Sequence, residues 1–278
     1  MDSIKDILKR RGIPVTETPT LSEKTPRERA LETAKSMNEL EGNLKGYDCP
    51  ICRNKGCVYV LRDGTDEIVY RRCQCLKVRQ EIIRIKESGL DKLGNKCTFR
   101  NFKTEERWQK QIKNAGKAFA SEKPNKSWFY IGGQPGSGKT HICTAIGMQL
   151  IKEGVPVRYM VWPEEIQKLK AYINDISFES LVNAYKTVDV LYIDDFFKVR
   201  KGEKISTADV NMAIRIINHR YNAELVTIIS SELSVQQIVE LDEALGSRIV
   251  EMTPDKYNLY IQYDIRKNYR FNKKGNVI

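Results

Sequence analysis

Apolar and polar positions alternate in a regular way over the second half of the chain. Short apolar runs typical of buried strands are separated by stretches in which apolar residues recur with helical spacing. We expect strands at residues 127–132, 155–161, 188–193, 225–230 and 249–252. We expect helices at residues 139–153, from Trp162 to about residue 185, at residues 206–222, and from Ser234. This alternation predicts an α/β fold with a mostly parallel sheet and helices on both faces.

The first hundred residues follow a different pattern. A short amphipathic helix is expected at residues 2–11, followed by a polar linker. Thr25 can cap a second helix, because Pro26 suits its first turn and Glu28 can complete a capping box. Two strands, at residues 58–62 and 67–72, flank a turn signal and form a hairpin. Basic and mixed helices are expected at residues 76–87 and 105–120.

These patterns divide the chain into four parts. We expect an N-terminal helical segment (1–46), a cysteine-containing hairpin module (47–89), a linker (90–104) and an α/β domain (105–278). No segment repeats, and none is of low complexity.

Composition narrows the class of protein. The 278 residues are 41% hydrophobic and 30% charged, which excludes wholesale disorder, collagen and coiled coil. No apolar run is long enough to span a membrane and no apolar leader is seen, so we expect a soluble, cytoplasmic protein. The net charge of +11 favours a polyanionic partner such as nucleic acid, although surface lysine also serves ordinary solvation.

A phosphate-binding loop follows the strand expected at residues 127–132. The motif G-x-x-x-x-G-K-[ST] is matched in full by Gly133, Gln134, Pro135, Gly136, Ser137, Gly138, Lys139 and Thr140. Its backbone N–H groups and the helix N-terminus can surround phosphate oxygens. We expect Lys139 to neutralise the β- and γ-phosphates of ATP and Thr140 to bind Mg²⁺. We include His141 among the residues expected to contact the nucleotide.

A nucleoside triphosphatase also needs an acid at the end of a neighbouring strand. Asp194 and Asp195 follow the apolar run at residues 190–193, which brings both carboxylates to the edge where ligands bind. We expect Asp194 to hold Mg²⁺ and Asp195 to orient or deprotonate the attacking water. Ser230 and Ser231 end the next strand, where a serine can lie between the γ-phosphate and the attacking water or can cap nearby backbone. We include Ser231 among the expected catalytic residues. Arg248 lies before the last expected strand and is either a residue that reaches a neighbouring protomer's γ-phosphate or a surface arginine.

Six of the seven cysteines lie between Cys49 and Cys97, which favours a metal site over disulfides. Cys49 and Cys52 form a C-x2-C pair. Cys73 and Cys75, two apart on an extended segment, can face the same ion. We expect these four thiolates to bind one structural Zn²⁺, with Cys57 as a competing ligand. Buried or redox-active thiols and an iron–sulfur cluster are the alternatives. Cys97 and Cys143 resemble ordinary small core residues.

Together these motifs resemble the AAA+ ATPases, and in particular the replicative helicase loaders of the DnaC and DnaI type, including phage versions. The residues that carry the resemblance are the phosphate loop, Ile193–Phe196, Ile228–Leu233, Ala244–Ile249 and the cysteines ahead of Thr98–Phe102. The resemblance implies an AAA+ core that self-associates and, under the control of ATP, transfers a hexameric replicative helicase onto single-stranded DNA. It also implies that Arg248 is an arginine finger acting between protomers.

The sequence departs from the family pattern at three places. The second acid is Asp195, where AAA+ proteins usually carry glutamate, and Glu232 stands where some relatives carry asparagine. About 26 residues follow Met252, too few for a full AAA+ lid, although Arg266 and Arg270 are candidates for a lid arginine. Three alternatives remain: a transposition ATPase of the IstB type, a zinc-dependent DNA-binding adaptor whose nucleotide site does not hydrolyse, and a helicase, which the lack of a second set of motifs disfavours.

Overall fold

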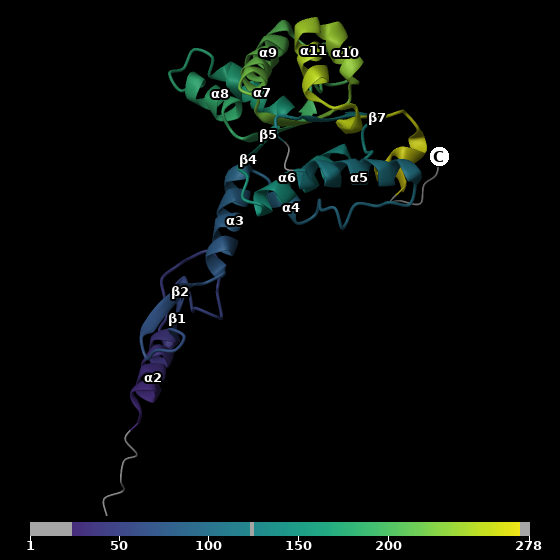
Figure 1. The fold of residues 1–278 in the computed structure, drawn as a ribbon. Helices are drawn as coiled ribbons and strands as arrows, with labels where there is room; N and C mark the ends of the chain where they lie inside the picture. The colour runs from purple at the N-terminus through teal and green to yellow at the C-terminus, as the bar shows by residue number, and fades with distance from the viewer. Residues whose placement is uncertain (1–23, 123–124, 273–278) are drawn as a thin grey trace, which may run out of the picture. The chain divides into compact units, whose positions relative to one another are not determined.

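The computed structural model describes residues 24–122 and 125–272 (Figure 1). The chain divides into two compact units between Arg79 and Gln80, within helix α3 (Cys75–Ser88). The helix expected at residues 2–11 lies outside the described residues. No helix in the described ranges is long and apolar enough to cross a membrane.

The first unit is a helix packed on a hairpin. Helix α2 (Pro26–Glu39) begins at the expected capping box, in which the backbone N–H of Glu28 donates to Thr25 Oγ1 and that of Thr25 donates to the Glu28 carboxylate. Strands β1 (Cys57–Leu61) and β2 (Ile68–Arg72) pair antiparallel. The Asn38 side chain forms two 2.8 Å hydrogen bonds with the backbone of Tyr59, which fixes α2 against β1.

The second unit contains the expected parallel sheet. Its strand order is β4-β5-β6-β3-β7, and every pairing is parallel. The strands are β3 (Phe129–Gly133), β4 (Val157–Val161), β5 (Val190–Phe196), β6 (Val226–Ser231) and β7 (Asn258–Ile261). The carboxyl ends of β3 and β5 lie on either side of β6, so the sheet brings the phosphate loop and the two aspartates to one edge.

Alternate residues of each strand enter two separate cores. In β5, Leu191 and Ile193 face one side, while Val190 and Tyr192 face the other. Helices α5 (Arg107–Ser121) and α6 (Lys139–Lys152) cover the second of these faces (Figure 1). The first face is covered by α7 (Trp162–Ala171), α8 (Phe178–Lys186), α9 (Thr207–Asn222), α10 (Val235–Leu241) and α11 (Glu243–Met252). The expected α/β class is confirmed.

One buried arginine ties several of these elements together. Arg220, near the end of α9, is fully buried. Its guanidinium donates to the carbonyls of Tyr185, Val188 and Val226 and to the hydroxyl of Thr227, among other acceptors. Backbone oxygens and a hydroxyl thus satisfy its donors, as a buried charge requires.

The strand expected at residues 249–252 is wrong. These residues end helix α11, whose first turn is capped by Asp242 accepting from the N–H of Leu245 at 2.7 Å. Leu245 and Ile249, four apart, are both buried, so the apolar run is one face of a helix. The fifth strand is instead β7, and two short 3₁₀ turns, η1 (Asp255–Tyr257) and η2 (Ile265–Lys267), and helix α12 (Tyr269–Asn272) complete this region.

Residues 90–104, expected to be a linker, are part of the second unit. They contain the short helix α4 (Asp91–Gly94), and Leu90 and Phe102 are buried in the core that α5 and α6 share with the sheet. The structure therefore places a division between compact units ahead of this segment, within α3.

Candidate nucleotide site and cysteine cluster

The phosphate loop connects β3 to α6 and depends on glycine for its shape. Gly133 has a φ of 126°, and a Cβ there would lie 2.3 Å from the carbonyl oxygen of Ile261 on β7. Gly138 caps α6 with a φ of 92°. Both are backbone conformations that other residues rarely adopt, so the motif's glycines are required by the local geometry.

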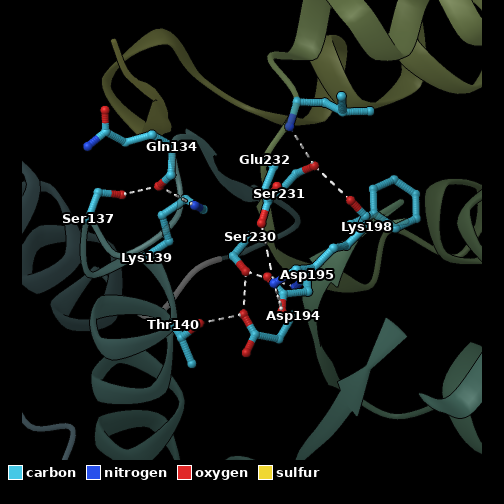
Figure 2. Close-up of polar contacts among 12 residues, drawn as sticks. Gln134, Ser137, Lys139, Thr140, Asp194, Asp195, Lys198, Ser230, Ser231 and Glu232 are labelled. Carbon is cyan, nitrogen blue, oxygen red and sulfur yellow. Dashed lines mark hydrogen bonds and ion pairs between the residues drawn. The ribbon is translucent and has the colours of Figure 1, made fainter. Parts of the chain in front are cut away.

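Lys139 lies inside the loop. Its Nζ donates to the carbonyl of Gly133 at 2.7 Å and to that of Gln134 at 2.9 Å. The Ser137 hydroxyl also donates to the Gln134 carbonyl, as Figure 2 shows. Burial lowers the pKa of Lys139, although the charges of Glu232 and Asp195 oppose this shift. The loop thus holds one ammonium group at the N-terminus of α6, where phosphate oxygens are bound in phosphate loops.

Asp194, at the end of β5, is nearly fully buried and accepts three hydrogen bonds. Figure 2 shows Thr140 donating to Oδ1 at 3.1 Å and Ser230 donating to the same oxygen. Tyr159 donates to Oδ2 at 2.9 Å. Burial and the charge of Asp194 raise the pKa of the Tyr159 phenol. Neighbouring ligands of an octahedral Mg²⁺ at about 2.1 Å lie about 3 Å apart, so the oxygens of Thr140 and Asp194 fit such an ion.

Asp195 lies in a strained turn beside it. Its φ is 53°, and its N–H donates to Ser230 Oγ at 3.1 Å. Its carboxylate lies 2.9 Å from Lys198 Nζ, which is also 3.3 Å from a carboxylate oxygen of Glu232 (Figure 2). Burial alone would lower the pKa of Lys198, but the hydrogen bond to Asp195 and the two carboxylate charges raise it.

The two serines of β6 have different partners. Ser230 contacts both aspartates, as described above. Ser231 is also buried, but its hydroxyl donates to the Phe196 carbonyl at 2.7 Å and accepts from the N–H of Leu233 at 3.1 Å. Its hydrogen bonds are thus made to backbone, which favours the capping interpretation for Ser231 and leaves Ser230 beside the acids.

A cavity of about 480 Å³ opens above the loop. It is lined by the loop itself, by the segment ahead of α5, by the ends of β5 and β6, and by α12. The lining residues are Lys96, Cys97, Asn101, Phe102, Lys103, Pro135, Gly136, Gly138, Lys139, Thr140, His141, Asp195, Lys198, Glu232, Tyr269 and Arg270. Five of the eight motif residues therefore share one cavity with His141 and Asp195.

His141 forms one wall of this cavity. Its Nε2 lies 2.8 Å from the carbonyl oxygen of Thr98, and its ring meets that of Phe102 edge-on. Burial lowers the pKa of His141, which favours the neutral ring. Sequence reasoning missed the role of Phe102 because it assigned that residue to a linker.

The segment after β7 closes the other side of the phosphate loop. The Gln134 amide exchanges two hydrogen bonds with the backbone of Asp264, and the N–H of Tyr269 donates to the Gly136 carbonyl at 2.9 Å. Of the two candidate lid arginines, Arg270 lines the cavity, whereas Arg266 forms two hydrogen bonds with the carboxylate of Asp264.

Arg248 lies within helix α11, which continues to Met252, and not directly ahead of a strand. Its guanidinium stacks over the ring of Tyr221 at 5.5 Å and donates to the Ala244 carbonyl. It does not line the cavity that the described residues of its own chain form around the phosphate loop.

The four expected zinc ligands meet in the first unit. The sulfurs of Cys49, Cys52, Cys73 and Cys75 all lie within 4.8 Å of one another and are buried. Two pairs are separated by 3.7 Å and 3.5 Å. Thiolates about 2.3 Å from a tetrahedral Zn²⁺ lie about 3.8 Å apart, so the cluster fits this ion. Cys57 is only half-buried and is not part of the group.

Arg79 lies close in sequence to the second cysteine pair, and its side chain stabilises the first unit. It is buried and donates to the carbonyl of Tyr47 at 2.6 Å and to Asn54 Oδ1 at 2.7 Å. Asn54 Oδ1 also accepts from the N–H of Cys49. Arg79 therefore stabilises the loop that carries the first cysteine pair. The basic residues around it in the sequence do not indicate this structural role.

Comparisons with known proteins agree with this geometry. The family model described as "IstB-like ATP binding protein" matches residues 72–252. The phage-like element PBSX protein XkdC of Bacillus subtilis (strain 168) is 33% identical over 226 residues, which cover 77% of this chain and 83% of that protein. The replicative helicase loader DnaC of Buchnera aphidicola subsp. Acyrthosiphon pisum is 26% identical over 216 residues, 76% of this chain and 83% of that protein.

The fold is also found among solved structures. A crystal structure of the DnaC helicase loader superposes with a TM-score of 0.53 at 20% identity, covering 60% of this chain and 97% of that one. At this identity the likeness establishes the AAA+ fold alone.

Proposed function

Because this chain belongs to the family of IstB-like ATP binding proteins, we propose that it hydrolyses ATP to load a replicative helicase onto single-stranded DNA. The observation that carries the proposal is the arrangement at the sheet edge, where Asp194 and Asp195 lie beside Thr140 of the phosphate loop. The similarity to the DnaC loader of Buchnera over most of that protein's length supports loading as the purpose of hydrolysis.

In the proposed reaction each side chain has a separate task. Lys139 holds the β- and γ-phosphates, and Thr140 and Asp194 hold Mg²⁺, which neutralises phosphate charge when bound. Asp195 orients or deprotonates the attacking water, and Ser230 holds the Asp194 carboxylate and the backbone of Asp195 in place. Arg248 of one protomer reaches the nucleotide of the next, so turnover depends on self-association through the ATPase domain.

We assign partner recognition to the cysteine module. A hairpin of two five-residue strands buries little apolar surface, and Zn²⁺ on four thiolates would supply the free energy that folds it. A module that folds around its own metal can carry a binding surface while the AAA+ core carries ATP. The helicase is its proposed partner, and single-stranded DNA is the proposed substrate of the complex.

A transposition ATPase of the IstB type is the second candidate, since the matching family model is described as an IstB-like ATP binding protein. The four-cysteine cluster argues for the loader, because a cysteine module ahead of the ATPase core resembles the architecture of the DnaI-type loaders. An adaptor without hydrolysis is disfavoured, because Asp195 lines the cavity that would hold the nucleotide.

The proposal is tested by capture of the replicative hexameric helicase from the organism that carries the gene. Tagged protein should retain that helicase with Mg-ATP, and adding it should increase helicase assembly on circular single-stranded DNA. Asp195→Asn protein should still capture the helicase but should not complete a loading cycle. Failure to bind the helicase in any nucleotide state, with ATP hydrolysis intact, would favour the transposition candidate.

A further inference from the structure

Lys198 occupies an unusual position at the nucleotide site. It follows β5 by two residues, and its ammonium contacts Asp195 and Glu232 at once. The phosphate-loop cavity also contains Lys139 and Arg270, so Lys198 is one of several cations on its wall. Lys198 differs from these other cations because it forms an ion pair with Asp195, the carboxylate proposed to act on the attacking water.

The backbone that carries Lys198 is firmly fixed. Phe196 and Phe197 are buried, stack on each other at 4.1 Å and both pack against Trp162. Phe197 has a φ of 58°, and the N–H of Lys198 donates to the Asp195 carbonyl at 3.0 Å, closing a tight turn. Strained backbone of this kind persists where surrounding packing determines it. The part of Lys198 that can change partners is therefore its four-carbon side chain.

ATP would change the charge balance around this side chain. A γ-phosphate bound beside Lys139 brings further negative charge into a cavity that already holds Asp195 and Glu232. Lys198 is close enough to line the same cavity, and its raised pKa keeps it charged at neutral pH. A charged hydrogen bond to a phosphate oxygen competes with partly exposed ion pairs, which contribute little.

We propose that Lys198 distinguishes ATP from ADP: it pairs with Asp195 and Glu232 when no γ-phosphate is bound and transfers to the γ-phosphate when ATP binds. The transfer releases the Asp195 carboxylate for the attacking water only in the ATP-bound state. This inference rests on the proposed ATPase function, because it requires ATP in the cavity.

The structure also links this lysine to a neighbouring region. A second cavity, of about 590 Å³, lies between α7 and the segment from β5 to α9. Among the described residues, Asp195 and Lys198 line both cavities. A change of partner by Lys198 would therefore alter the charge at the mouth of this second cavity as well.

The test compares affinities for two nucleotides. Equilibrium titration with Mg²⁺ and either ADP or a non-hydrolysable ATP analogue gives the preference for the triphosphate. Lys198→Met keeps the aliphatic stem and should lower that preference about tenfold, leaving ADP affinity nearly unchanged. Lys198→Arg should retain most of the preference. Lys201→Ala, which removes a charge from an exposed residue of the same segment, is the matched control.

A second variant keeps the inference testable if Lys198→Met fails to fold. Glu232→Gln removes one competitor for the ammonium and should increase the preference for the triphosphate. Equal loss of affinity for both nucleotides in Lys198→Met, or an unchanged preference in both variants, would overturn the inference. If the wild-type protein binds neither nucleotide, the proposed function itself fails, which is a different result.

Discussion

The hydroxyl of Thr140 donates a hydrogen bond to Asp194 Oδ1 at 3.1 Å, although 54 residues separate the two in the chain. The contact exists because β5 and β3 end at the same edge of a parallel sheet, with β6 between them. It joins the phosphate loop directly to the acidic strand end. Each part of this site can be tested by its own substitution.

Removing the loop lysine should abolish most nucleotide-dependent stabilisation. With Mg-ATP at about 100 times its dissociation constant, the wild-type core should gain roughly 2.7 kcal/mol in its free energy of unfolding. Lys139→Ala should lose most of this gain, because the buried ammonium no longer faces the phosphates. Thermal melts with and without Mg-ATP measure the difference, and Lys152→Ala, an exposed lysine at the end of the same helix, is the control. A wild-type melting temperature that ignores Mg-ATP would contradict the phosphate-loop assignment.

Neutralising the second aspartate should separate binding from turnover. Asp195→Asn should bind Mg-ATP with affinity near the wild-type value, since Thr140 and Asp194 are intact, but release of phosphate should fall to background. Asp194→Asn should instead weaken the dependence of binding on Mg²⁺. Turnover at the wild-type rate in Asp195→Asn would transfer the catalytic role to another residue.

Arg248→Ala should leave the nucleotide affinity of an isolated protomer nearly intact, because the residue does not line its own chain's cavity. In the assembled state, turnover should fall by about 10³ or more if Arg248 contacts a neighbour's γ-phosphate. Mixing it with Asp195→Asn protein should partly restore phosphate release, since each mixed interface can contain one intact set of residues. Arg215→Ala, another arginine on the same side of the sheet, should retain activity. No loss in Arg248→Ala would make it a surface residue.

The cysteine cluster predicts about one Zn²⁺ per chain by elemental analysis. Changing Cys49 and Cys52 together to serine should release the metal and unfold the hairpin, since metal binding supplies its folding free energy. Cys57→Ser is a matched control and should keep the full complement. Helicase capture should be lost in the double variant while ATP binding persists. Iron with sulfide in the purified protein would refute zinc but leave the four ligands in place.

The lowered pKa of His141 should make the free energy of unfolding depend on pH. Burial holds its pKa below the ordinary value of 6.5, so the unfolded chain takes up this proton first as the pH falls. The neutral His141 ring therefore contributes fully to the free energy of unfolding above about pH 6.5. This contribution is lost as the pH falls through the lower pKa that His141 has in the folded protein. Urea unfolding at pH 7 and pH 5 should show a larger loss for the wild type than for His141→Gln. Equal losses in the two proteins would show that His141 titrates as in the unfolded chain.

The features that could be predicted from the sequence are those built from residues close together in the chain. The phosphate loop and Asp194 follow apolar strands directly, so strand, turn and carboxylate can be recognised together. Tyr159 and Lys198 give no such signal, because their partners come from other elements of the fold. Helix α11 was mistaken for a strand because a short apolar run has the same composition in either structure, and only the burial of Leu245 and Ile249 separates them.

The buried guanidinium of Arg220 has a consequence for how the core opens. It is bonded to the chain around Val188, ahead of β5, and to the start of β6, while it is itself part of α9. Local unfolding of the chain around Val188 or of the start of β6 would leave the Arg220 guanidinium buried without its hydrogen-bond acceptors. Partial opening there is costly, so α9, β5 and β6 should exchange their amide hydrogens in a single cooperative event. Strand β5, which carries Asp194, would then stay folded while helices at the surface unfold and refold locally.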